Sequence, residues 1–486
     1  MRRLLILLSA ALVTAFVAGC GGSSSGAPAG SPTTQVLSYF PPATPFVMTL
    51  STASTAGSAQ SQHALTRRIP SIAVAETALF AKLSQLGIDY NKDIRPLFGK
   101  PIAVGAAGTA ISGTHTPFLV AWVTGSAAKL SALAGKISGL HGAGTRDGAK
   151  LFSANSVAAA ISGPTLLLSG TLPDVEAALD RHAHQQGFTA AQYAQETSGI
   201  STSAKVQMFG DLRSVLATPS AVKARTVPWV AAIKGYAVSV GSTATAVTMR
   251  YHIDTSGAPL TAAQLPIASG SSSPPLAGDM PVQTAVRDPA QIVTFIEAAV
   301  RETSPAQYTK FLSQSAALQR RSGFDVNALL GMLTGALNVE SDTHSTIMRA
   351  QVSNPAGAAT MIAKLVHSGA LPKWARVADL GGGLYSLHSA GSSATATMGV
   401  IGSYLLLGET TTPAQLRAFA AAPASAASTG SGSVSFRIAL ADLLRLTLKD
   451  RLPTVTQQYL SLLGDFSGSA SATTSGLSGT ATLTLR

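Results

Sequence analysis

Residues 86–89 read Leu-Gly-Ile-Asp and lead to Leu-Phe-Gly at 97–99, and residues 322–325 read Ser-Gly-Phe-Asp and lead to Leu-Thr-Gly at 333–335. The first Gly, the Asp, the Leu and the final Gly match at one constant spacing without a gap. Self-similarity between distant stretches is the signature of an internal repeat. The sequence therefore predicts two copies of one structural unit.

Three further pairs of matching stretches follow in the same order along the chain: 163–168 with 402–407, Asp211-Leu212 with Asp442-Leu443, and 246–250 with 481–486. Both members of the first pair end in three leucines and precede a Thr and a Pro-led helix. The last pair alternates apolar and polar residues, which is typical of a half-buried strand. Four ordered matches predict a duplicated chain.

Local patterns give both copies a mixed content of strands and helices. We expect Asp89 and Asp325 to cap a short helix in each copy, and Gly99 and Gly335 to form its left-handed end. The predicted helices cover 70–86, 127–137, 289–321 with a break at Ser304-Pro305, and 356–366. The predicted strands cover 46–50, 102–106, 119–123, 151–153, 157–161, 166–169, 347–352, 384–385, 397–400 and 405–407. Hairpin-spaced strands with inserted helices predict an α+β fold of two tandem similar units, each a mainly antiparallel sheet with several packed helices.

Composition divides the chain into five expected parts. A Gly/Ser-rich stretch follows Cys20 and indicates a flexible tether. A second low-complexity stretch lies at 268–275. We therefore expect a signal peptide at 1–19, a tether at 20–35, a first α+β unit at 36–255, a Ser/Pro-rich linker at 256–278 and a second α+β unit at 279–486.

The N-terminus has the pattern of a secretion signal. Met-Arg-Arg precedes an apolar run at 4–17, which is shorter than the roughly 20 residues that a membrane-spanning helix needs. The run ends in Val17-Ala18-Gly19-Cys20, and Cys20 is the only cysteine of 486 residues. This ending resembles the bacterial lipobox, although the family normally has Leu where Val17 stands. An ordinary signal peptide that is cut elsewhere is the alternative.

The lipobox resemblance implies cleavage between Gly19 and Cys20 and acylation of Cys20. Two or more acyl chains anchor a protein stably, at about 0.8 kcal/mol per buried CH₂. The expected location is the extracytoplasmic face of a cell membrane, reached by the general secretory route. Removal of the leader would leave no cysteine besides the acylated one, so disulfides cannot reinforce the exported part.

A second resemblance concerns the whole exported part. The order of signal, tether, a Phe-Pro-Pro-Ala-Thr-Pro-Phe entry at 40–46 and a repeated α+β unit is similar to a family of bacterial envelope proteins known only as a domain of unknown function. The resemblance implies an extracytoplasmic location, but no reaction and no ligand.

The formal net charge of +12 indicates attraction to anionic surfaces without defining a partner. The basic residues are scattered, and no basic stripe is interleaved with aromatic residues, so a nucleic-acid partner is not expected. The expected partners are the membrane, through the lipid anchor, and an envelope protein or an anionic polymer. With 46% apolar residues the chain can build cores.

Short motifs of serine enzymes occur in unfavourable contexts. Gly22–Gly26 fits G-x-S-x-G, but it lies in the tether and lacks the strand and helix that this motif requires. The pattern S-x-x-K occurs at Ser126–Lys129 and at Ser220–Lys223, without a K-T-G element, and Ser153-Ala154-Asn155 only partly resembles S-D-N. Ser126 also begins a predicted helix, where serine is a favoured cap. We expect no catalytic residue among these.

The remaining candidates also have simple structural interpretations. His182 and His184 are two residues apart on a predicted helix and point to different sides, so we expect no metal site there. The repeated carboxylates Asp89 and Asp325 are explained as caps, and Gly381–Gly383 as a turn. Paired acids brought together by the fold stay open. The sequence predicts no cofactor, and it leaves the ligand-binding residues unknown.

Three hypotheses follow for the function. The first is a non-enzymatic binding or scaffold protein of the cell envelope. The second is an envelope hydrolase with an unrecognised nucleophile, which would require a hydroxyl and a base within about 3 Å of each other in a cleft. The third is a carrier of lipids or other apolar ligands, which an apolar cavity within each unit would favour.

Overall fold

The computed structural model divides into two compact units. Unit 1 comprises Met1–Pro219 and Ile233–Asp254, and unit 2 comprises Ser220–Ala232 and Thr255–Arg486. The structure describes residues 31–53, 77, 80, 81, 83–85, 87–109, 117–137, 139–154, 157–201, 204–270, 272–369, 371, 375–389, 395–423, 432–448 and 460–486. The predicted signal peptide, Cys20 and most of the predicted helix at 70–86 lie outside these residues.

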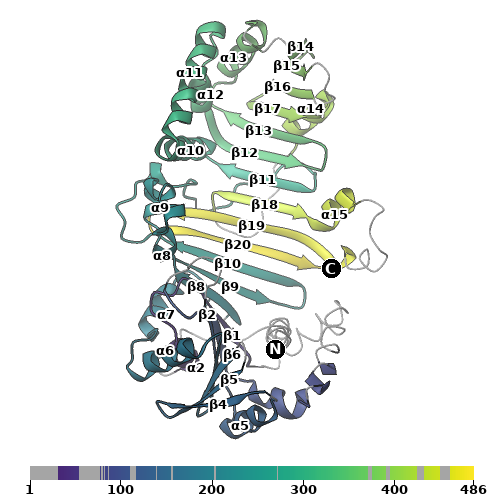
Figure 1. The fold of residues 1–486 in the computed structure, drawn as a ribbon. Coiled ribbons are helices and arrows are strands. Elements are labelled where there is room, and N and C mark those ends of the chain that lie inside the picture. The colour runs from purple at the N-terminus through teal and green to yellow at the C-terminus, as the bar shows by residue number, and fades with distance from the viewer. Residues whose placement is uncertain are drawn as a thin grey trace. The chain divides into compact units, whose positions relative to one another are not determined.

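Unit 1 is built on an antiparallel sheet (Figure 1). Its strands are β1 (Val47–Ser51), β2 (Pro101–Ala106), β3 (Phe118–Val123), β4 (His141–Arg146), β5 (Ala149–Ala154), β6 (Val157–Ser162), β7 (Thr165–Ser169), β8 (Val206–Asp211), β9 (Gly235–Ser242) and β10 (Ala246–Asp254). Their order across the sheet is β4-β5-β6-β7-β3-β2-β1-β8-β9-β10.

Both faces of the unit 1 sheet are packed. The helical elements are α2 (Pro32–Leu37), η1 (Tyr90–Ile94), η2 (Arg95–Leu97), α5 (Ala127–Lys136), α6 (Leu172–Ala183), α7 (Ala190–Glu196) and α8 (Arg213–Leu216). On one face, α2, α6 and α7 enclose a core that includes Phe40 and Phe209. On the other face, Leu130 and Leu133 of α5 pack with Trp122 of β3.

Unit 2 repeats this sheet. Its strands are β11 (Val282–Arg287), β12 (Leu333–Ser341), β13 (Thr346–Val352), β14 (Ala375–Asp379), β15 (Leu384–Ser389), β16 (Thr395–Ile401), β17 (Tyr404–Glu409), β18 (Val434–Ala439), β19 (Leu463–Thr473) and β20 (Gly476–Leu485). Their order is β14-β15-β16-β17-β13-β12-β11-β18-β19-β20, again antiparallel. Each strand therefore has the place of its unit 1 counterpart, which confirms the predicted fold class of two similar α+β units.

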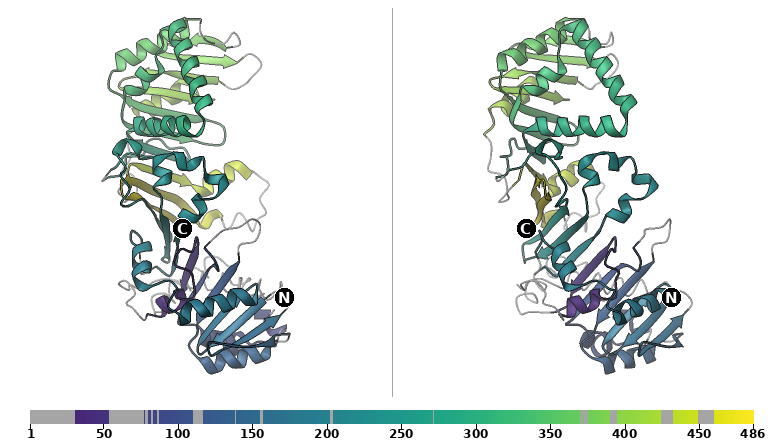
Figure 2. Two further views of the ribbon diagram at one scale, coloured as in Figure 1. Left: turned by 60° about the vertical axis from the view of Figure 1, so that its left-hand side comes forward. Right: turned by 90° about the vertical axis from the view of Figure 1, so that its left-hand side faces the viewer.

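The helices of unit 2 differ more in length than its strands do. They are η4 (Ala224–Thr226), α9 (Pro228–Ala231), η5 (Ala262–Gln264), α10 (Pro289–Thr303), α11 (Pro305–Ser322), α12 (Val326–Gly331), α13 (Pro355–His367), α14 (Pro413–Ala421) and α15 (Leu440–Leu448), and the short η3 (Pro219–Ala221) spans the division between the units. The predicted break at Ser304-Pro305 separates the long helices α10 and α11, which Figure 2 shows meeting at an angle.

Equivalent residues confirm several local predictions. The Asp89 carboxylate accepts backbone hydrogen bonds from Asn91 and Lys92, and Asp325 accepts one from Ala328, so both cap the short helical element that follows. Gly163 and Gly402 have φ angles of 54° and 57°. Both lie in the two-residue turns of equivalent hairpins, where a left-handed conformation favours glycine.

Other local predictions need correction. Gly335 has the expected positive φ of 70°, but it lies within β12 at a register shift and not at a helix end. The pairing of Asp211 with Asp442 is also wrong, because Asp211 ends β8 whereas Asp442 lies in α15. By backbone register Asp211 corresponds to Ala439, since both backbone amides bond to the entry of the first strand.

The predicted tether and linker each contribute residues to the fold. Within the segment 20–35, Ser31 caps α2, and Thr34 is buried. Within the segment 256–278, Leu265, Leu276 and Ala277 are buried in unit 2. Both segments therefore contribute to packing as well as to connection.

Candidate functional site

The first S-x-x-K motif is a helix cap in the structure. Ser126 precedes α5, and its Oγ accepts a hydrogen bond from the backbone nitrogen of Lys129 at 3.3 Å. The equivalent helix α13 is capped by Asn354, whose side chain accepts from the nitrogen of Gly357 at 2.9 Å. A serine and an asparagine therefore fill the same structural role in the two units. The second motif begins at Ser220 within η3 and ends at Lys223, which directly precedes η4.

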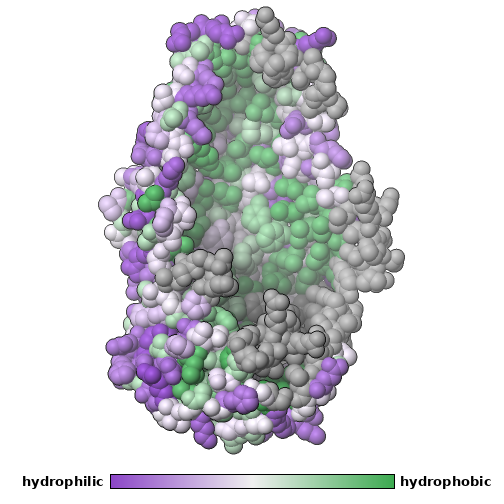
Figure 3. All heavy atoms as spheres, in the orientation of Figure 1, coloured by the Kyte–Doolittle hydropathy of each residue, from purple (hydrophilic) through white to green (hydrophobic). Residues whose placement is uncertain are grey.

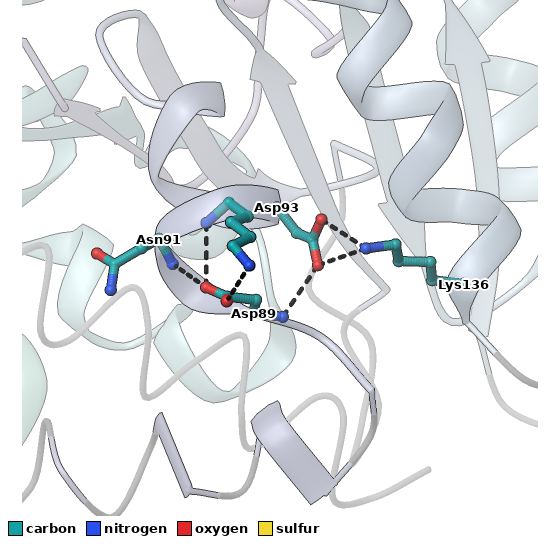
Figure 4. A network of polar contacts seen from close by, with 5 residues as sticks. Asp89, Asn91, Asp93 and Lys136 are labelled. Atoms are coloured by element: carbon teal, nitrogen blue, oxygen red, sulfur yellow. Dashed lines mark hydrogen bonds and ion pairs between the residues drawn. The ribbon is translucent and has the colours of Figure 1, made fainter.

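Asp89 belongs to a network of polar contacts in unit 1 (Figure 4). The Asp93 carboxylate accepts from the backbone nitrogen of Asp89 at 2.9 Å and from Lys136 Nζ at 2.7 and 2.8 Å. The hydrogen bond from Lys136 is the main reason that the pKa of Asp93 lies below its ordinary value. The network ties η1 to the last residue of α5, which is a structural role for both acids.

His182 lies close to a hydroxyl that also has a backbone partner. Its Nδ1 lies 2.6 Å from Ser38 Oγ, and its ring stacks on Tyr39 at 4.3 Å between centroids. The Ser38 hydroxyl donates to the carbonyl oxygen of Gln35 at 2.7 Å. A hydroxyl has one proton to donate, so when Ser38 donates to Gln35 the contact with His182 requires Nδ1–H as the donor. Burial also holds the pKa of His182 below its ordinary value.

A second hydroxyl–imidazole contact lies in unit 2. His388 Nε2 is 3.0 Å from Ser386 Oγ, and His388 Nδ1 is 3.2 Å from Thr395 Oγ1. Ser386 is buried, at 3% exposure. Its hydroxyl is therefore closed to a substrate in solvent.

Metal-ligating residues do not gather in the part of the chain that the structure describes. Within it, no three His, Cys, Asp or Glu side chains lie close enough to hold an ion. His184 directly follows α6, and its Nδ1 lies 2.9 Å from the carbonyl oxygen of Asp180 in that helix. Gly381, Gly382 and Gly383 all have positive φ and form the predicted turn between β14 and β15. Within the same residues, no helix is long and apolar enough to span a membrane.

The most unusual feature of unit 2 is the polarity of its sheet. The face formed by Gln283, Asn338, Glu340, Arg349 and Ser435, here called the closed face, is buried although it is polar. Glu340 Oε2 accepts from the backbone nitrogens of Asp279 and Met280 at 2.9 and 3.1 Å. Gln283 Nε2 donates to the carbonyl oxygen of Gly278 at 2.7 Å. Hydrogen bonds to the backbone of this segment offset the cost of burying the polar groups.

The opposite face, here called the open face, is apolar and remains partly exposed. Side chains alternate between the two faces along a strand. The neighbours of the closed-face residues therefore lie on the open face, and they are Val282, Leu337, Val339, Met348, Phe436 and Ile438. Phe466 extends the row, with its ring 5.3 Å from that of Phe436. Figure 3 shows apolar side chains gathered on a hollowed surface over the strands of unit 2, with helices α10–α12 along one side.

The equivalent faces of unit 1 have different chemistry. Ala103 and Ala121 of its core stand where Asn338 and Arg349 stand in unit 2. The face equivalent to the open face lies in a second core, where Leu50 packs with α5 residues. In unit 2, no residue of β11, β18 or β19 belongs to a core cluster of the described residues. Unit 2 has thus kept the topology of unit 1, but its open face belongs to a packed core only near α12 and α13, where Leu333, Val352 and Leu405 lie, and not on β11, β18 and β19.

Sequence reasoning missed the open face. Residues 282–286 read Val-Gln-Thr-Ala-Val, and residues 434–438 read Val-Ser-Phe-Arg-Ile. An alternating strand is ordinarily taken to have its apolar side in the core and its polar side in solvent. Here the polar side is covered. Asn338 and Glu340 alternate with Leu337 and Val339 in the same way, and this alternation gives no sign that the polar side is the covered one.

Comparisons with known proteins add little. No protein-family model matches the chain, and no curated protein matches it. Among solved structures, three that are described as crystal forms III, IV and I of TP0453 match with TM-scores of 0.27, 0.27 and 0.26 and identities of 9%, 10% and 8%. They cover 46%, 45% and 46% of this chain and 81%, 79% and 81% of their own chains. A likeness at this level assigns neither a family nor a function.

Proposed function

We propose that this protein is a lipid-anchored binding protein on the extracytoplasmic face of a cell membrane, and that the open face of unit 2 takes an apolar ligand. The lipobox-like Val17–Cys20 supports the anchor and the location. The open face is the observation that carries the ligand class. Its strands offer a set of partly exposed apolar side chains, whereas Gln283, Asn338, Glu340 and Ser435 of the same strands are buried on the closed face.

A hydrocarbon ligand suits such a surface because it has no polar groups that need hydrogen-bond partners. Apolar contact is favourable by about 25 cal/mol per Å² of surface removed from water. Large apolar patches on soluble domains mark interaction sites or ligand grooves. A polar ligand would find few partners here, since the hydroxyls of β11, β12 and β13 on this face are Thr284 and, at one edge, Ser341 and Thr346.

Two hydroxyl groups that are candidates for the nucleophile of a hydrolase have hydrogen-bond partners in the backbone. Ser126 accepts from the backbone of its own helix, and Ser38 donates to a backbone carbonyl. Both contacts favour binding without chemistry over the hydrolase alternative.

An environment-sensitive apolar dye, N-phenyl-1-naphthylamine, tests the binding site. The variant Val339→Glu places a charge at the centre of the open face and should weaken dye binding by about tenfold or more. A tenfold loss corresponds to only about 1.4 kcal/mol, which is less than the cost of burying a carboxylate against an apolar ligand. Val222→Glu places the same charge at an exposed valine of unit 2 and is the matched control. Equal dye affinity in wild type and both variants would refute the open face as a binding site.

The anchor has a separate test. Cys20→Ser should move the protein from the membrane fraction to the medium, or leave it as uncut precursor. Native protein that fractionates with the cytosol and keeps residues 1–19 would contradict the proposed location.

A further inference from the structure

Helix α11 contributes little to the core of unit 2. None of its 18 residues is buried. Phe311 and Leu312 are 40% and 42% exposed, two of the few large apolar side chains that the described residues leave in solvent. Of its side chains only Leu318, near its end, packs against the core beneath α13. The first half of α11 therefore presents partly exposed apolar side chains that belong to no core cluster of the described residues.

The charges of α11 all have one sign. It carries Lys310, Arg320 and Arg321 and no acidic residue. Arg320 and Arg321 lie in its last turn, where the helix dipole favours cations. Lys310 lies in the second turn, where the dipole gives no such stabilisation, and it directly precedes Phe311 and Leu312. An exposed cation beside two exposed apolar side chains is complementary to a lipid surface, in which anionic headgroups cover apolar acyl chains.

We propose that α11 is a contact site for an anionic phospholipid surface. Phe311 and Leu312 enter the interface between headgroups and acyl chains, and Lys310 pairs with the anionic headgroups. Interfacial helices bind in this way, through buried apolar area and attraction to anionic lipids. The neighbouring exposed side chains of Gln307, Thr309, Ser313 and Gln314 are polar and uncharged, which suits the headgroup layer.

This inference goes beyond the proposed ligand site, because it concerns another surface of unit 2 and another partner. A lipid anchor fixes the chain to a membrane but does not orient it, whereas a second contact on α11 would. The two proposals can therefore fail independently, since dye binding reports on the open face and vesicle binding reports on α11.

The test uses the full mature chain with Cys20→Ser, which cannot be acylated and contains no cysteine. Co-sedimentation with vesicles of 30% phosphatidylglycerol in phosphatidylcholine should exceed that with pure phosphatidylcholine. The variants Phe311→Ser with Leu312→Ser, and Lys310→Gln, should each lower the partition coefficient, the first by about tenfold. Val222→Ser removes an apolar residue that is more exposed than either, and Arg376→Gln removes an exposed charge of unit 2. Both controls should bind as the parent does.

A fluorescent label distinguishes insertion from general charge attraction. In the cysteine-free chain, a nitrobenzoxadiazole label at Phe311→Cys should brighten and shift to the blue on anionic vesicles. The same label at Thr309→Cys, which is exposed two residues away on another side of the helix, should change little. Equal partition of α11 variants and controls, or equal responses of the two labels, would overturn the proposal.

Discussion

Arg349 on β13 donates a hydrogen bond from Nη1 to the carbonyl oxygen of Phe419 near the end of α14, at 2.6 Å. Its guanidinium carbon also lies 5.1 Å from the centre of the Phe419 ring. The same nitrogen reaches the carbonyl oxygen of Ala422 at 2.8 Å. The last carbonyls of a helix have no partner within it. One buried cation therefore joins the closed face of the sheet to the helix that covers it.

Replacement of this cation should be costly. Arg349→Met keeps much of the side-chain volume but leaves buried carbonyls unpaired, and it should lower the free energy of unfolding by about 3 kcal/mol. Urea denaturation of the variant measures the loss. Arg376→Met, at an exposed position of β14, should change stability little. Equal effects of the two variants would contradict the role assigned to Arg349.

Removal of either of the two equivalent helix caps should lower the stability of the protein by a similar amount. Asp89→Ala and Asp325→Ala each remove a carboxylate that accepts backbone hydrogen bonds at the start of a short helical element. Each should cost about 1 kcal/mol of stability, and the corresponding Asn variants should retain most of it. Thermal unfolding of the four variants tests this. Equal losses in Ala and Asn variants would mean that the carboxylates do not act as caps.

The two hairpin glycines should respond alike to substitution. A Cβ at Gly163 or Gly402 would meet no atom within 4 Å, so space does not limit either position. The cost of Gly163→Ala and Gly402→Ala is then conformational, about 1 kcal/mol each. Asn, which tolerates a left-handed conformation, should cost less. A neutral effect of alanine at either site, measured by urea denaturation, would show that the turn adopts another conformation.

Glu196 predicts a dependence of stability on pH. Burial, followed by the nearby charges of Asp211 and Asp254, raises the pKa of Glu196 above its ordinary 4.5. The folded protein therefore holds this proton more strongly than the unfolded chain, and the resulting stability is lost as pH rises through the folded pKa. Glu196→Gln should unfold at a higher temperature than wild type at pH 7. The difference should shrink when the pH falls below 4.5, and a difference independent of pH would contradict the prediction.

Local sequence predicted those features that depend on neighbours along the chain. The caps at Asp89, Asp325 and Ser126 and the break before Pro305 follow from hydrogen bonds and backbone geometry within one turn of helix. The hairpin glycines follow from the φ angle that their turns require. The predictions that depended on how the strands of the two units correspond were wrong. Gly335 is part of a strand irregularity, and Asp211 and Asp442 occupy different elements.

The sequence by itself determined the duplication and the α+β class, because each copy contains alternating strand patterns, helical periodicity and turn residues that depend only on neighbours along the chain. Only the tertiary structure decided which side of each sheet is covered. In unit 2 the backbone of residues 278–280 binds Glu340 and Gln283, and this contact covers the polar side. The apolar side is packed near α12 and α13 and stays partly exposed on β11 and β18. Alternation shows that a strand has two different sides, but the segments that pack against it come from elsewhere in the chain.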